Sequence, residues 1–317
     1  MQQPSTDYDS PWKEIVEIYF QDFIAFFFEE YYREFDWTQA YEFLDNELKQ
    51  VVRDADLGRR LVDKLVKIWH INGEQMWILV HIEVQSQEEN LFAERMFVYN
   101  YRIFDRYRRT VVSLAVLGDE NPVWRPNHFG YELLDCRMRL QFPIVKLLDY
   151  QENWAQLEES LNPFATVVMA HLKAKETTQD RLQRKRWKLI LTKRLYEKGY
   201  DREAVINLFS FIDWLMSLPK ELEQEFWQEL NEYEEEKTMR YVTSVERIGI
   251  EKGRQEGRQE GRQEGLLEAI EIGLSKFGDE GLTIFSEISQ IGEVERLKQI
   301  LRELPNVQSL DELRQFL

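Results

Sequence analysis

The stretch Arg59–Gln85 reads RRLVDKLVKIWHINGEQMWILVHIEVQ, and it predicts the hairpin around which the fold is organised. Two runs rich in β-branched and large apolar residues flank Asn72-Gly73. This dipeptide is the one that best supplies the two positive φ angles of a type I′ turn. We therefore expect two antiparallel strands joined tightly at Asn72-Gly73.

Acidic residues occur at matching places in the two runs. Asp63 and Glu83 lie about equally far from the turn, nine residues before it and ten residues after it. Because strand residues alternate between faces, His81, Glu83 and Gln85 are expected to share one face. Two carboxylates that meet near the open end of a hairpin suit Mg²⁺, which takes oxygen ligands and commonly one or two carboxylates. The stretch therefore predicts a hard-cation site.

Bulk composition indicates a cytoplasmic protein with more than one structural region. The chain has 317 residues, of which 43% are hydrophobic and 13% aromatic, enough for a sizeable core. Its one cysteine, Cys136, allows no intrachain disulfide and is typical of a reducing compartment. We find neither an apolar run near the roughly 20 residues of a membrane span nor signal-peptide features at the N-terminus, so no membrane partner is expected.

The charge balance bears on nucleic-acid binding. Lys plus Arg total 41 and Asp plus Glu total 58, which gives a net charge of −17. Such a chain repels nucleic acid on average, because affinity for the phosphate backbone comes mainly from Lys and Arg. A nucleic-acid role therefore requires a local basic patch, or a metal that offsets the carboxylates.

Periodicity predicts an α/β arrangement over residues 1–150. Aromatic residues at helical spacing indicate one helix from Trp12 to about Tyr32. A turn and a short helix (36–50) lead into the hairpin. A second aromatic helix (91–107), a buried strand (110–117) and further strand-like pieces follow, so we expect a mixed sheet flanked by helices.

Four arginines form roughly one stripe of the second aromatic helix: Arg95, Arg102, Arg106 and Arg109. They are either a solvated basic face or a face that contacts phosphates or orients a ligand. The second interpretation is supported by the position of this helix, which directly follows the Glu83–Gln85 strand.

Residues 151–250 are expected to be entirely helical. Helix starts are indicated at Asn162-Pro163, Asp180, Asp201 and Pro219. The helix 180–198 is the most basic segment of the chain. It could follow a phosphate backbone or pair with the acidic helix 221–236, and we favour charge pairing.

Residues 251–317 form a third region. Glycines 253, 257, 261 and 265 frame three copies of Gly-Arg-Gln-Glu. An isolated helix is disfavoured here, because each interior glycine costs on the order of 1 kcal/mol and the i,i+4 neighbours carry like charges. The repeat is either a flexible tether or a contact with an identical partner. We expect a homo-oligomer through this region and its amphipathic tail (266–317).

Several stretches together resemble one known family. These are DSPWKE, FLDNEL, VDKLVKI, HIEVQ, ERMFVYNYRIFDRY, NPFATVVMAHL and the Gly-Arg-Gln-Glu tail. They are similar to the Rpn family of recombination-promoting nucleases and transposase-like proteins, particularly its cyanobacterial members. The resemblance covers nearly the whole chain. It implies a PD-(D/E)XK restriction-endonuclease-like core followed by an all-helical C-terminal region.

The resemblance also implies roles for individual residues. Asp63 and Glu83 would bind Mg²⁺ or Mn²⁺, with the Val84 carbonyl as a further oxygen ligand. Gln85 takes the position that is usually lysine in this superfamily. A glutamine can orient the attacking water through its amide, but it carries neither a proton nor a positive charge.

The function expected from this resemblance is metal-dependent hydrolysis of DNA phosphodiester bonds, linked to recombination or mobile elements. The alternative is a weakly active or inactive nuclease fold that acts as a self-associating scaffold through its helical half and tail.

Overall fold

A computed structural model describes residues 9–44, 48, 62–83, 91–237, 241–242, 261, 265–274, 277, 284–285, 287–291, 293–304, 307 and 312–313. For residues 9, 10, 62, 63 and 80–83 the description covers the backbone and not the side chain. Val84, Gln85 and most of the Gly-Arg-Gln-Glu repeat lie outside the described residues. The chain combines a mixed sheet and helices in its N-terminal half with a mostly helical C-terminal region.

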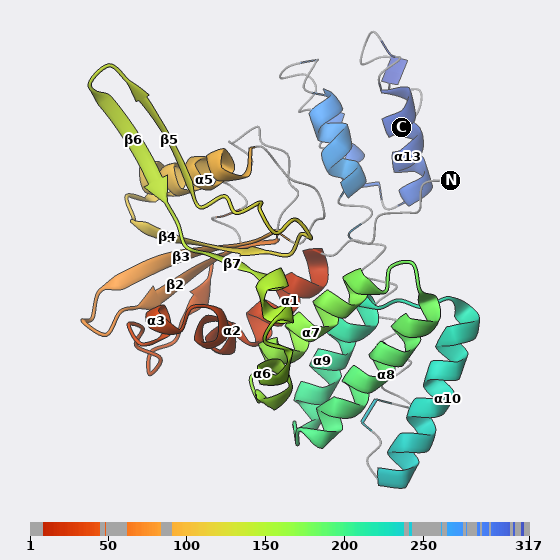
Figure 1. The fold of residues 1–317 in the computed structure, drawn as a ribbon. Coiled ribbons are helices and arrows are strands. Elements are labelled where there is room, and N and C mark those ends of the chain that lie inside the picture. Colours follow the sequence, from red (N-terminus) through yellow and green to blue (C-terminus); the bar gives the residue numbers. More distant parts are fainter. Residues whose placement is uncertain are drawn as a thin grey trace. The chain divides into compact units, whose positions relative to one another are not determined.

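The sheet has five strands in the order β1-β2-β3-β4-β7 (Figure 1). The strands are β1 (Glu42–Phe43), β2 (Val62–Trp69), β3 (Gln75–Glu83), β4 (Val111–Leu117) and β7 (Ile144–Lys146). β2 is antiparallel to both β1 and β3, whereas β3, β4 and β7 are parallel. The predicted mixed sheet is therefore confirmed.

Helices cover both faces of this sheet (Figure 1). α5 (Phe92–Tyr107) connects β3 to the parallel strand β4 and packs its Tyr99 and Ile103 against Leu65 and Leu79. The other face is covered by α1 (Asp9–Ile18) and α2 (Phe20–Phe27). Double coverage explains why the central strands are apolar on both faces.

The long first helix predicted over residues 12–32 is wrong in one respect. The chain forms three helices there, α1, α2 and α3 (Glu29–Tyr32), with breaks at Tyr19 (φ −121°, ψ 40°) and Phe28 (φ −138°, ψ 53°). At the second break, the Phe27 ring packs against Phe164, which is far away in the sequence, and the buried Phe28 packs against Phe23. Tertiary packing here overrides the helical period.

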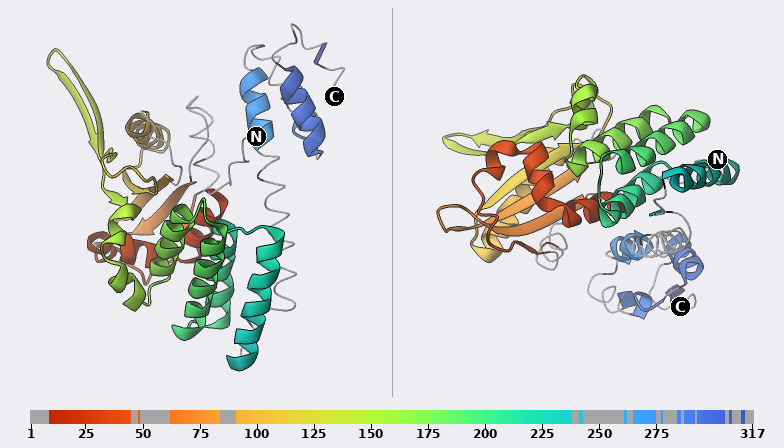
Figure 2. Two further views of the ribbon diagram at one scale, coloured as in Figure 1. Left: turned by 45° about the vertical axis from the view of Figure 1, so that its right-hand side comes forward. Right: turned by 90° about the horizontal axis from the view of Figure 1, so that it is seen from below.

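Residues 128–141 form a separate antiparallel hairpin of β5 (His128–Leu133) and β6 (Cys136–Gln141). It extends away from the five-stranded sheet (Figures 1 and 2). The short strand β1, which pairs with β2 at Val66 and Lys67, was not predicted.

The helices of the following region begin close to where their cap residues predict. α7 (Pro163–Glu176), α8 (Arg181–Glu197) and α9 (Arg202–Leu215) are capped by the side chains of Asn162, Asp180 and Asp201, respectively. A 3₁₀ turn (Leu147–Gln151), α6 (Trp154–Glu159) and α10 (Lys220–Lys237) complete it.

Charge pairing between the basic α8 and the acidic α10 is confirmed. Lys185 Nζ lies 2.6 Å from Glu225 Oε2 and 2.9 Å from Glu229 Oε1. Lys188 is fully buried and pairs with Asp213 of α9 at 2.6 Å and with Glu223 at 3.2 Å. These lysines are therefore engaged within the protein.

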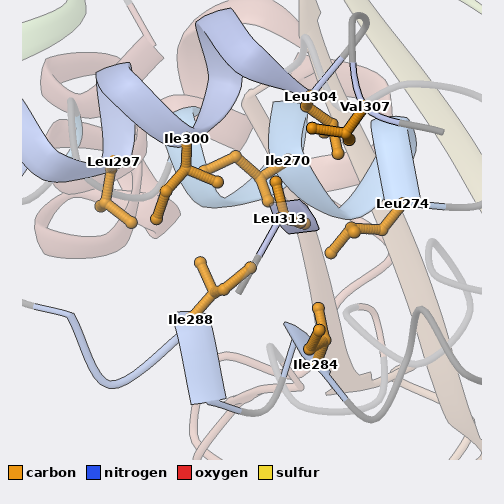
Figure 3. Close-up of a cluster of buried hydrophobic side chains, with 9 residues drawn as sticks. All are labelled: Ile270, Leu274, Ile284, Ile288, Leu297, Ile300, Leu304, Val307 and Leu313. Carbon is orange, nitrogen blue, oxygen red and sulfur yellow. The ribbon is translucent and has the colours of Figure 1, made fainter. Parts of the chain in front are cut away.

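The C-terminal segment has an apolar core of its own (Figure 3). The chain divides into one compact unit spanning Tyr8–Ser244 and another that contains residues 245–317. In the latter, Leu297 and Ile300 of α13 (Val294–Glu303) gather with side chains from the preceding helical segments, among them Ile270 and Ile288 (Figure 3). Among the described residues, no helix combines the length and apolarity needed to cross a membrane.

Candidate functional site

The turn between β2 and β3 differs from the predicted type I′ turn. Gly73 has φ +87°, but Asn72 is not among the residues with positive φ. The last strand pair is Trp69 with Gln75. Beyond it, His70 and Glu74 still face each other, because the His70 N–H donates to the Glu74 carbonyl at 2.8 Å. The loop therefore spans three residues, 71–73, instead of the two-residue Asn72-Gly73 connection.

The three-residue loop sets the register of the carboxylate positions. Asp63 lies directly opposite His81, so Glu83 is its diagonal neighbour two residues along β3. Alternation along β3 then gives positions 63, 81 and 83 one common face. A two-residue loop would shift the register by one residue and put positions 63 and 83 on opposite faces.

Position 83 lies at the carboxyl-terminal edge of the parallel strands. Glu83 pairs with Leu117 at the end of β4, and Leu117 pairs with Lys146 at the end of β7. In open α/β sheets, ligands bind outside this edge, where loops and helix termini meet.

The first turn of α5 covers this part of the sheet. Phe92 and Met96 pack with Leu117, the residue that pairs with Glu83. The amino end of a helix carries a partial positive charge and favours anions. Arg95 belongs to the same turn, is only 2% exposed, and its guanidinium lies 5.6 Å from the centre of the Phe92 ring.

The four arginines of the predicted stripe differ in their surroundings. Arg95 is buried and Arg102 is partly buried, whereas Arg106 and Arg109 are exposed. Arg109 also lies beyond the end of α5 at Tyr107. Arg95 is therefore no part of a solvated basic face. Its position in the first turn of α5 makes it the member of the set nearest in the fold to the edge that ends at Glu83.

Sequence reasoning missed one buried ion pair at this edge. Lys146, adjacent to Leu117 in register, pairs with Asp119, and both side chains are almost fully buried. Lys146 Nζ also donates to the Trp124 carbonyl at 3.3 Å and lies 5.4 Å from the centre of its ring. The sequence could have indicated this pair only through the positions of the two residues, because polar residues at the ends of parallel strands gather at one edge of the sheet.

The loop that follows β4 is held by a second ion pair, between Arg125 and Asp149. Arg125 Nη1 lies 2.8 Å from Asp149 Oδ2. Hydrogen bonding to Arg125 lowers the pKa of the Asp149 carboxyl.

Lys64, the residue after Asp63, points to the opposite face of the sheet, where its Nζ lies 2.7 Å from Glu17 Oε2 of α1.

The donor types at positions 63 and 83 fit a hard cation. Two carboxylates at diagonal positions are compatible with Mg²⁺, which keeps part of its water shell. The side chains of Asp63 and Glu83 lie outside the described set, as do Val84 and Gln85 entirely. Among the side chains that are described, no group of three or more His, Cys, Asp or Glu is arranged to hold a metal ion.

Comparison of the chain with known protein families, with curated proteins and with solved structures finds no match.

Proposed function

We propose that this chain is a Rpn-type, metal-dependent DNA endonuclease with a PD-(D/E)XK core. In that fold, the Asp lies on one strand of a hairpin and the Glu-X-Gln or Glu-X-Lys triplet on the next. The observation that carries the proposal is the β2–β3 register, in which Glu83 is the diagonal neighbour of Asp63. Such diagonal positions are about 7–8 Å apart, a separation that two carboxylates sharing one cation can bridge.

The topology around the hairpin supports the same proposal. Glu83 ends a strand whose next neighbour, β4, is parallel, and α5 connects the two. A phosphate approaching this edge would meet the amino end of α5. The partial positive charge of that end favours an anion and offsets some of the repulsion expected from the net charge of −17.

Each residue has a limited chemical role in this proposal. Asp63 and Glu83 would hold the metal ion, and the Val84 carbonyl would add a further oxygen. Bound Mg²⁺ would polarise the phosphate and supply activated water. Gln85 would orient that water through its side-chain amide, but it cannot take up a proton or stabilise negative charge as lysine does. We therefore expect slow cleavage.

The test is nicking of supercoiled plasmid in the presence of Mg²⁺ or Mn²⁺. Wild type should nick, whereas Asp63→Asn and Glu83→Gln should lose detectable activity. Both substitutions remove one charge and keep the side-chain size. Glu74→Gln is the matched control, because Glu74 is an exposed carboxylate in the same hairpin beside the turn.

Binding of Mn²⁺ to the metal-free protein gives a readout independent of turnover. Each active-site substitution should weaken it by about ten-fold or more, because a direct ligand is lost. Equal nicking by wild type and both variants would reject the site. Metal binding without any nicking by wild type would instead favour the inactive scaffold.

A further inference from the structure

The β5–β6 hairpin has one apolar and one polar face. Residues directly opposite in an antiparallel pair share a face. On one face, the opposed pairs are Phe129 with Leu140, Tyr131 with Met138, and Leu133 with Cys136. On the other face they are His128 with Gln141, Gly130 with Arg139, and Glu132 with Arg137.

The base of the apolar face is half-buried and packs against the rest of the protein. The Phe129 ring stacks on Phe97 of α5 at 5.1 Å between ring centres, and Tyr101 of α5 also stacks with Phe97, at 6.3 Å. Leu140 packs against the cluster that contains Phe92 and Leu117. The exposed part is therefore continuous with a packed aromatic row.

The outer part of the same face has no cover. Tyr131 is 53%, Leu133 72% and Met138 41% exposed. At the tip, Leu134 has φ +53° and is 90% exposed. A leucine is unfavourable at a positive φ, where Gly or Asn is preferred. A two-stranded hairpin is also only marginally stable by itself. An exposed apolar face on such a hairpin is typical of a surface that binds an apolar partner.

The chemistry of this face argues against nucleic acid. No charged side chain belongs to the three apolar pairs. The hairpin's four charges are two acidic and two basic, and Glu132 pairs with Arg137 at 2.9 Å. A β-ribbon that enters a DNA groove needs cationic side chains that are available to phosphates.

We propose that this apolar face binds the same face of a second copy of the chain. The residues Tyr101, Tyr131, Leu133, Leu134 and Met138 together expose on the order of 600 Å², about three quarters of the roughly 800 Å² per partner of a standard interface. Two chains that each carry a net charge of −17 repel one another, and this uncharged strip is where such chains can meet with least repulsion. The two hairpins would pack face to face as a small sandwich of two sheet layers. This contact differs from the one expected through residues 251–317.

The test is the concentration dependence of the mass of the full-length chain by sedimentation or light scattering. Wild type should rise from 38.4 kDa toward twice that value. Leu133→Glu should weaken association by about a hundred-fold or more, because a carboxylate would be buried against an apolar face. Leu133 is largely exposed, so the fold should survive, and Met138→Glu provides a second variant. Gln141→Glu adds the same charge on the polar face and should associate like wild type.

Cys136 gives an independent readout, since it is exposed and is the chain's one cysteine. Its reaction with a thiol reagent should slow as the protein concentration rises in wild type and Gln141→Glu, but not in Leu133→Glu. Three results overturn the proposal. One is a wild-type mass that stays at a single chain. The second is undiminished association of Leu133→Glu, which would assign the contact elsewhere. The third is weaker DNA binding by Leu133→Glu than by wild type when both proteins are monomeric, which would make the hairpin a DNA contact.

Discussion

His171 is a titratable side chain that the fold holds in its neutral form. It lies fully inside the protein on α7, with Nε2 2.9 Å from the Gly118 carbonyl at the end of β4 and its ring 6.0 Å from that of Trp12. Burial, with a smaller contribution from the charge of Lys175, lowers its pKa from 6.5 to about 4. The unfolded chain therefore binds a proton that the folded chain excludes.

This difference predicts a loss of stability in mild acid. As the pH falls from 6.5 to 4, only the unfolded state gains the proton, which should lower the free energy of unfolding by about 3 kcal/mol. His171→Phe should lower stability at pH 7, because the Gly118 carbonyl loses its donor, but it should remove this part of the acid dependence. Denaturant titrations at several pH values measure the free energy of unfolding and its dependence on pH. The exposed His128, as His128→Gln, is the control, and an unchanged slope in His171→Phe would contradict the burial argument.

At the scale of the element, the turn of the β2–β3 hairpin decides the site. Gly73 takes the positive φ, while the Asn72 Oδ1 accepts the Glu74 N–H at 2.9 Å. Contacts from outside the hairpin support this loop, because the Ile71 N–H donates to the Glu34 carbonyl at 3.0 Å and Phe35 bridges to His70. These contacts come from a segment far away in sequence.

The turn predicts a measurable cost at Gly73. Gly73→Ala should destabilise the protein by about 1–2 kcal/mol, because a side chain at φ +87° is strained, although no atom within 4 Å obstructs the added Cβ. Gly73→Asn should cost less, since asparagine tolerates this conformation. Equal effects of the two substitutions, by thermal or denaturant unfolding, would argue against a left-handed residue at this position.

At the scale of the molecule, the two compact units offer separable signals. All nine tryptophans occur between Trp12 and Trp227, within the unit Tyr8–Ser244. The C-terminal apolar cluster contains none of them. Tryptophan fluorescence therefore follows one unit, and hydrogen exchange of C-terminal peptides follows the other.

Ile300→Ala should affect only the C-terminal unit. Ile300 is fully buried in that cluster, and such a truncation commonly costs about 2–5 kcal/mol. Exchange in the C-terminal peptides should accelerate while the unfolding midpoint by fluorescence stays constant. Leu195→Ala, a comparable truncation in α8, should shift the fluorescence midpoint instead. A midpoint shift in Ile300→Ala would mean that the two units unfold together.

Local chemistry in the sequence was sufficient for several elements. The starts of α7, α8 and α9 were predictable because an N-cap side chain bonds to backbone only two or three residues away. The strand β4 was predictable from its continuous apolar run, and α5 from its aromatic period. The breaks at Tyr19 and Phe28 were not, because packing around the aromatic residues of α1 and α2 outweighs local helical preference.

The sequence by itself determined that a hairpin turns near Asn72-Gly73 and that carboxylates occur on both of its strands. Only the tertiary structure decided that positions 63 and 83 share a face, because one residue more or less in the loop reverses that relation. The three-residue loop contacts residues 34–35, which are distant in the sequence, and no local pattern indicates such contacts. The burial of Arg95 and the pairing of Lys146 with Asp119 have the same origin, since each depends on packing between elements that are distant in sequence.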